Sequence, residues 1–175
     1  MKGLRIRTMG LESHKAFVRS LGATPVALEW TNLVTSIRTG VVDGQMNPAA
    51  IIRFARLDDV QRYATATHHF YTPYFWVMNQ AFLANLSENE RRIVHRAARS
   101  GIQASRTLAK SQVDGHVAAL ARRMEIYHPT ETEMAAFRDA SQPVMRTHIA
   151  AALGDEGIAL LDAFLAAIKD VRAKQ

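Results

Sequence analysis

Short strand-type segments alternate with helical patterns through the first part of the chain, and this alternation constrains the fold more than any other feature. Residues 4–8 alternate polar and apolar side chains with a period of two, as in a strand. Helical spacing follows over residues 11–21, then a strand over 24–28, a short helix over 31–39 and a strand over 41–45. Alternating strands and helices predict an α/β layer with a largely parallel sheet.

The middle of the chain predicts a long helical spine. Threonines and aromatic residues between positions 64 and 79 first indicate one or two buried strands. Ser87 and Glu90 then form the pattern of a capping box, which predicts a helix start. Apolar and small residues recur at helical spacing over about 35 residues, which predicts a stripe packed in the core. Gly101 and Gly115 are candidate kinks in this helix.

The remainder of the chain is predicted to be a helical tail. Residues 124–127 indicate a brief strand, and Thr130 with Glu133 repeats the capping pattern. Pro143 predicts a kink in the helix that follows, because proline lacks a backbone N–H. Gly154 predicts the end of that helix, with a last helix beyond it.

The composition excludes several function classes. Hydrophobic residues make up 48% of the chain and charged residues 22%, which favours a folded core over disorder. There is no cysteine, so disulfides and thiolate chemistry are excluded. The sequence has no Gly-rich phosphate loop and no Gly-x-Ser-x-Gly elbow, and its seven histidines include no pair at helical i, i+4 spacing. We therefore expect neither an enzyme nor a metal site nor a cofactor.

Three segments near the amino end carry a resemblance to a known family. Residues 3–8 read Gly-Leu-Arg-Ile-Arg-Thr, residues 21–26 read Leu-Gly-Ala-Thr-Pro-Val, and residues 39–48 read Thr-Gly-Val-Val-Asp-Gly-Gln-Met-Asn-Pro. In order and spacing they resemble motifs of the DctP-type solute-binding proteins, the substrate-capturing components of TRAP transporters. Shorter matches at residues 60–63 and 67–69 extend the resemblance along the chain.

The resemblance implies one lobe of a periplasmic clamshell that closes on a carboxylate ligand. Residues 1–72 would form the α/β ligand-binding lobe two. Residues 73–112, a strand plus the long helix, would complete lobe one, and residues 113–175 would return as helices packed on lobe two. The chain is thus expected to be an incomplete C-terminal portion, and residues 1–5 show no apolar run of an export signal. The implied function is to bind a small organic acid and deliver it to the membrane subunits of a TRAP transporter.

The resemblance also assigns ligand-binding residues. Arg7 matches the family arginine whose guanidinium fork pairs with the ligand carboxylate. Asn47 matches an asparagine that hydrogen-bonds the ligand, although a helix cap is an alternative role. Trp30 matches an aromatic residue of the pocket, with core packing as the alternative, and His69 matches a family histidine without an assigned role. Met46 replaces the usual glutamate, and the Glu-Trp pair of members that hold keto acids through a cation is absent, so no metal is expected.

Two alternatives from other classes stay open. A helical interaction or scaffold protein would need an exposed apolar stripe on the helix that begins near Ser87. A basic nucleic-acid-binding module would need its lysines and arginines gathered on one face. The net charge of this chain is +6, but its basic residues are scattered along the sequence, so no nucleic acid is expected as a partner. Residues 74–78 form an apolar run. By the resemblance this run would lie in the sheet of lobe one, and most of that sheet is expected to be absent from this chain. Because an unpaired apolar strand is a pairing site, self-association of the chain is expected.

Overall fold

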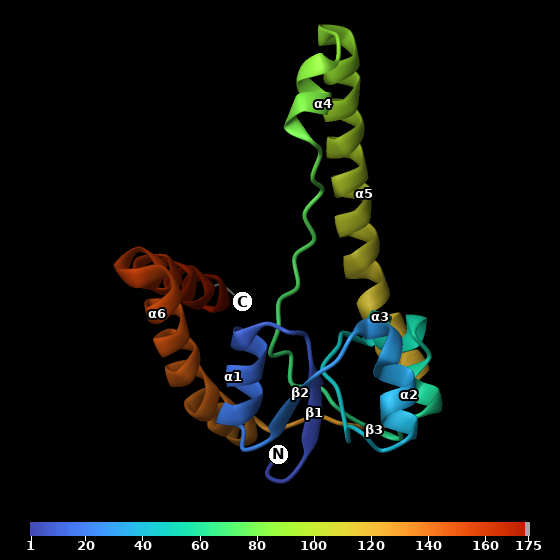
Figure 1. Cartoon of the computed structure of the whole chain (residues 1–175), viewed down its shortest axis with the longest axis vertical. Coiled ribbons are helices and arrows are strands. Elements are labelled where there is room, and N and C mark those ends of the chain that lie inside the picture. Colours follow the sequence, from blue (N-terminus) through green and yellow to red (C-terminus); the bar gives the residue numbers. More distant parts are fainter. Residues whose placement is uncertain (174–175) are drawn as a thin grey trace.

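The computed structural model describes residues 1–173 and combines short parallel strand pairs with long helices (Figure 1). The predicted α/β class is confirmed. Of the segment predicted as residues 113–175, Lys174 and Gln175 lie outside the described residues. In chain order the elements, with η for a 3-10 helix, are β1 (Arg5–Thr8), α1 (Glu12–Ser20), β2 (Thr24–Ala27), η1 (Trp30–Asn32), α2 (Leu33–Arg38), α3 (Ala49–Phe54), η2 (Leu57–Asp59), β3 (Tyr63–Thr65), α4 (Gln80–Asn85), α5 (Glu88–Leu120), β4 (Glu125–Tyr127) and α6 (Glu131–Arg172).

Strands β1 and β2 pair in parallel, as the alternation predicted, with Arg5 opposite Thr24. The predicted strand at 41–45 is wrong, because this segment contributes an isolated parallel bridge between Ile6 and Gly44. A Cβ on Gly44 would lie 3.1 Å from Ile6 Cδ1, so glycine permits this close approach. The chain then leaves the sheet to begin α3, with Pro48 at the N-cap position.

The second strand pair joins two distant parts of the chain. Strand β3 pairs in parallel with β4, so the predicted brief strand near residue 125 is confirmed. One core lies beside this pair and contains the buried side chains Leu33, Ile52, Leu57, Leu120 and Met124. A second core lies between β1 and α1 and contains Ile6, Phe17, Val18 and Ala23. The end of α5 packs on α3, and α6 packs on α1, so each long helix is anchored on one core.

The aromatic segment after β3 does not form the buried strands that its composition predicted. Strand β3 has three residues, and the chain then runs irregularly alongside α5 up to α4 (Figure 1). Tyr74, Phe75 and Val77 are 79%, 83% and 90% exposed. A strand needs a neighbour to pair its backbone groups, and within the described residues no strand flanks this segment.

Helix α5 begins at the predicted capping box, where Ser87 and Glu90 bond reciprocally. It continues without interruption to Leu120, so the candidate kinks at Gly101 and Gly115 are not observed. Gly101 instead provides room for a neighbour, since a Cβ there would lie 2.5 Å from the Trp76 ring. The prediction that the apolar stripe packs in the core is wrong for the middle of α5. Its carboxyl end is buried, but in the projecting part Leu108 and Val113 are 56% and 53% exposed.

Helix α6 also begins at its predicted capping box, formed by Thr130 and Glu133. Its backbone keeps helical dihedral angles past Pro143 and leaves them at Gly154, where φ is 62°. The two halves of α6 then lie side by side, linked by a bond of 2.9 Å from Arg146 Nη2 to Asp162 Oδ2. Within residues 1–173, no helix has the length and apolar character needed to cross a membrane.

Replacing Leu57 with alanine should destabilise the fold. Leu57 is fully buried in the first core, so Leu57→Ala is expected to lower the free energy of unfolding by about 2–5 kcal/mol. Phe54→Ala is the matched control, because Phe54 lies three residues earlier and is 81% exposed. It should change the same quantity by less than about 0.5 kcal/mol. Urea unfolding followed by circular dichroism measures both, and equal losses would contradict the core described here.

Candidate ligand-binding site

Arg7 is a buried arginine whose charge has no partner in the described part of the chain. It lies near the end of β1 and is 8% exposed. Its Nε donates to the carbonyl oxygen of Leu28 at 3.0 Å. No carboxylate among the described residues lies within 4.0 Å of its guanidinium, although the charge of Glu29 acts from further away. Burial lowers the pKa of Arg7, because a desolvated cation is disfavoured. The outer nitrogens of this guanidinium are therefore open to an anion.

Arg5 stands on the same strand and has the opposite environment. It is exposed, and its Nε and Nη2 donate to the two oxygens of Asp43 at 3.0 and 2.7 Å. These bonds, together with a bond from the Arg5 backbone N–H, lower the pKa of Asp43 to about 2. The Arg5 fork is occupied within the protein, so of the two arginines on β1 Arg7 is the one available for a ligand.

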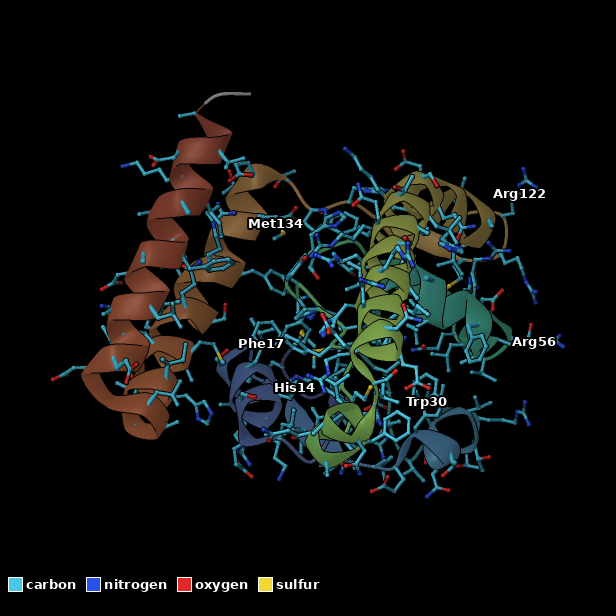
Figure 2. All side chains as sticks on the ribbon, turned by 90° about the horizontal axis from the view of Figure 1, so that it is seen from above. His14, Phe17, Trp30, Arg56, Arg122 and Met134 are labelled. Atoms are coloured by element: carbon cyan, nitrogen blue, oxygen red, sulfur yellow. The ribbon has the colours of Figure 1, made fainter. Side chains whose placement is uncertain are left out.

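Trp30 lies beside Arg7 and remains partly open to solvent. The Arg7 guanidinium carbon is 5.8 Å from the centroid of the Trp30 ring, which is within the range of a cation–π contact. Trp30 is 40% exposed, so the alternative of simple core packing is wrong. Figure 2 shows Trp30 on the opposite side of the molecule's centre from Phe17 and α6.

Asn47 belongs to a short chain of amide side chains. Its Nδ2 donates to Gln45 Oε1 at 2.6 Å, and Gln45 Nε2 donates to Gln61 Oε1 at 3.1 Å. All three residues are half-buried. The alternative of a helix cap is wrong, because the N-cap of α3 is Pro48 and no side chain caps that helix.

His69 is held against α1 by aromatic contacts. Its ring is parallel to that of Phe17 at 4.9 Å, and the Phe70 ring lies 4.5 Å away at a tilt. The Thr67 hydroxyl bonds to His69 Nδ1. Although the residue keeps an exposed edge, this enclosure desolvates the ring and, with the nearby His14 and His68, lowers the pKa of His69 to about 4.

His14 is a member of this cluster that the sequence did not single out. Its ring lies 5.0 Å from Phe70, and its pKa is lowered by burial and by the positive charge of Arg7. The aromatic cluster therefore reaches the neighbourhood of Arg7. One signal could have indicated it: His14 and Phe17 are three residues apart in a predicted helix, so they share a face. Figure 2 shows both on α1.

Three candidate residues follow neighbouring parallel stretches of one sheet. Arg7 lies near the end of β1, Trp30 follows β2, and Asn47 follows the bridge at Gly44. In open α/β sheets, ligands bind outside the carboxyl ends of the strands. His69 follows β3 of the other sheet and joins this region through α1.

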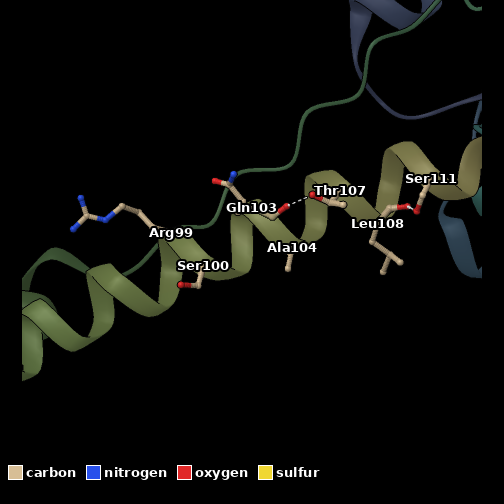
Figure 3. A pocket seen from close by; sticks show the side chains of 7 residues that line it. All are labelled: Arg99, Ser100, Gln103, Ala104, Thr107, Leu108 and Ser111. Carbon is tan, nitrogen blue, oxygen red and sulfur yellow. Dashed lines mark hydrogen bonds between the residues drawn. The ribbon is translucent and has the colours of Figure 1, made fainter.

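A separate groove lies along α5 and contains none of these residues (Figure 3). One face of a single helix forms it, from Arg99, Ser100, Gln103, Ala104, Thr107, Leu108 and Ser111. It lacks groups that converge from different elements, so the candidate site is placed at Arg7 instead. Within the described residues, no group of three His, Asp or Glu side chains is arranged to hold a metal ion.

The sequence matches a known family and proteins within it. A family model described as "Bacterial extracellular solute-binding protein, family 7" matches residues 1–152. The C4-dicarboxylate-binding periplasmic protein DctP of Rhodobacter capsulatus is 28% identical over 163 residues, covering 92% of this chain and 49% of that protein. The ectoine-binding periplasmic protein TeaA of Halomonas elongata is 29% identical over 178 residues, covering 97% and 50%. The chain spans about half the length of these relatives.

Solved structures are similar over the same extent. A TRAP periplasmic solute-binding protein from Ochrobactrum anthropi has a TM-score of 0.83 and 31% identity, covering 99% of this chain and 53% of that one. Another, from a Polaromonas species and bound to D-erythronate, has a TM-score of 0.81 and 27% identity, covering 93% and 53%. The fold described above is thus similar to about half of each of these proteins.

The stability of the fold should depend on the titration of His69. Its pKa is about 4 in the folded chain and about 6.5 in an unfolded one, so the unfolded state binds more protons between these values. The contribution of neutral His69 to the free energy of unfolding is therefore complete above pH 6.5, and it should be lost as the pH falls toward 4.

Nuclear magnetic resonance titration of the His69 ring measures the folded pKa directly. The free energy of unfolding is also measured at several pH values for the unchanged chain and for His69→Gln. His128→Gln is the control, because His128 is an exposed histidine. A His69 midpoint near 6.5 would contradict the enclosure of this ring.

Proposed function

The chain belongs to family 7 of the bacterial extracellular solute-binding proteins, and from this premise we propose that it supplies the arginine-bearing half of a binding site for a small organic acid. The acid would then pass to the membrane subunits of a TRAP-type transporter. A relative named for C4-dicarboxylates and a similar structure bound to D-erythronate support a carboxylate ligand.

One observation carries the proposal: Arg7 is buried, and no carboxylate of the described residues pairs with it. Burying an unpaired charge is costly, and an anion that enters the site removes that cost. A carboxylate can accept two parallel bonds from the outer guanidinium nitrogens. Each charge-assisted bond contributes about 1.5–3 kcal/mol. Trp30 and the Leu28 carbonyl already hold the guanidinium in place.

We propose that the acid is captured between two lobes. In this division residues 1–72 form the ligand-binding lobe two, residues 73–112 contribute to lobe one, and residues 113–175 return to lobe two. The projection of α4 and most of α5 away from the two sheets supports this division (Figure 1). Closure would be stabilised by contacts that only the liganded, closed state makes.

An exposed stripe on α5 is also what the alternative of a helical scaffold requires. Leu108 and Val113 meet that requirement. Family membership favours solute binding, and the two-lobe division explains the same exposure, because lobe one would cover this part of α5. The buried and unpaired Arg7 has no role in a scaffold.

The family consists of solute-binding proteins rather than enzymes, and its relatives are named as periplasmic. For this chain we propose the same compartment and no bond-making chemistry. Residues Arg7, Asn47, Trp30 and His69 are proposed as ligand-site residues.

We also propose that the chain by itself associates with further copies. Residues 74–78 are apolar, exposed and without a paired strand in the described residues. Their irregular backbone leaves donors and acceptors for a second copy, and their side chains lose contact with water on pairing.

Acids should bind at Arg7, and the corresponding amides should not. Acetate and succinate are expected to shift the Arg7 Nε–H resonance, whereas acetamide and succinamide leave it unchanged. Arg7→Ala should weaken acid binding, measured by calorimetry, at least tenfold, since about 1.4 kcal/mol is a factor of ten. Arg5→Ala is the control, because that guanidinium is occupied by Asp43. Equal shifts from acids and amides, or equal losses from both variants, would contradict a carboxylate site at Arg7.

The double variant Phe75→Ser with Val77→Ser should shift the chain toward the monomer. Size-exclusion chromatography with light scattering measures the mass of the unchanged chain and of the variant. Phe54→Ser removes an equally exposed apolar side chain elsewhere and should leave the mass unchanged. A monomeric unchanged chain would refute association through residues 74–78.

A further inference from the structure

A hollow of about 330 Å³ between α3 and the end of α5 is lined mainly by arginines. Arg53 lies on α3, Arg56 follows that helix, and Arg122 and Arg123 follow α5. Figure 2 shows Arg56 and Arg122 toward the same edge of the molecule. None of the candidate acid-binding residues lines this hollow, so a ligand held there is distinct from an acid held at Arg7.

The first hydrophobic core holds both walls of the hollow in place. Ile52 and Leu57 on one wall are buried together with Leu120 and Met124 on the other. Each of these four buried residues is next in sequence to a residue that lines the hollow. The arginine side chains are therefore exposed, but the backbone that carries them is rigid. A binding site on a rigid backbone loses less conformational entropy when a ligand binds.

The carboxylates beside the hollow are already paired. Arg123 Nε lies 3.1 Å from Asp58 Oδ2, and Arg123 Nη2 also pairs with Asp59. Arg56 Nε lies 2.8 Å from the other oxygen of Asp59. The Asp58 side chain is 8% exposed, so its charge is enclosed by this pairing. Four arginines and two aspartates together give the region a formal charge of +2.

Two arginines of the hollow have no carboxylate partner. In the part of the chain that the structure describes, no carboxylate oxygen lies within 4.0 Å of the Arg53 or the Arg122 guanidinium. Arg53 Nη1 donates to His116 Nδ1 at 3.0 Å, and this bond steadies the guanidinium without neutralising it. The excess positive charge of the hollow therefore lies on Arg53 and Arg122, one on each wall.

We propose that this hollow binds a phosphate-type dianion between Arg53 and Arg122. Such a group has several acceptor oxygens, so it can accept paired bonds from more than one guanidinium. Its two negative charges balance the formal charge of the region, whereas a single carboxylate or a phosphodiester lipid headgroup supplies one. Inorganic phosphate and phosphate monoesters share this chemistry. The bound group joins α3 to α5, the helix whose other end projects from the two sheets (Figure 1).

The test titrates the full chain with inorganic phosphate at about pH 8, where a phosphate group carries close to two negative charges. A constant ionic strength of about 0.1 M screens charges more than about 10 Å apart. Nuclear magnetic resonance follows the Nε–H groups of Arg53 and Arg122, and both should shift together. Arg53→Gln and Arg122→Gln should each weaken phosphate binding about three- to tenfold, the loss of a charge-assisted contact. Acetate at equal concentration should shift both groups much less.

Arg106→Gln is the matched control, because Arg106 is an exposed arginine of α5 outside the hollow and the change removes the same charge. It should leave phosphate binding unchanged. Equal weakening by Arg106→Gln and Arg122→Gln would show attraction to net charge alone and would overturn the inference. It would also be overturned if phosphate shifted neither group, or if acetate shifted both as strongly. Binding to phosphatidylglycerol vesicles through these arginines, without binding of inorganic phosphate, would replace the proposed ligand with a lipid surface.

Discussion

Strand β1 is hydrogen-bonded along both edges, and this double pairing places most of the candidate site. One edge pairs in parallel with β2. On the other edge the Arg7 N–H donates to Gly44 O, and the Asp43 N–H donates to Arg5 O, each at 2.8 Å. Backbone pairing fixes register, so the position of Arg7 along β1 determines which segments surround it. The same bonds hold Asp43 and Gly44, and so they also position the segment that leads to Asn47.

The two arginines of β1 differ in their surroundings, and this difference distinguishes a structural side chain from a candidate ligand-binding one. Arg5 is exposed to solvent, and its guanidinium forms an ion pair with Asp43. An ion pair at the surface contributes little to the free energy of unfolding. Arg7 is desolvated, and it is steadied by the Leu28 carbonyl and the Trp30 ring. An arginine that is already ordered loses little side-chain entropy when a ligand binds, so more of the interaction free energy appears as affinity. Pre-organisation of this kind is what a capture protein requires.

The distribution of buried surface suggests how such a chain could move. Both cores lie beside the strand pairs, and they anchor the end of α5 and the first part of α6. Helix α4 and the projecting part of α5 rest on few buried side chains, with the packing of Trp76 on Gly101 among them. Regions with few buried apolar contacts open at low free energy, so we expect the projecting arm to be the adaptable part and the β1 region the rigid one.

The sequence by itself determined the features that depend on near neighbours along the chain. Both capping boxes, the strand at β1, the break at Gly154 and the parallel α/β class follow from local hydrogen bonding and periodicity, and the family motifs pointed to Arg7 and Asn47. Tertiary structure decided the rest. Residues 66–79 have strand composition but no paired neighbour. The stripe on α5 has helical periodicity, but within the described residues little covers its middle part. His14 and Gln61 joined the site through contacts with residues distant in sequence. Burial and strand pairing depend on what the chain meets in space, and sequence spacing does not encode that.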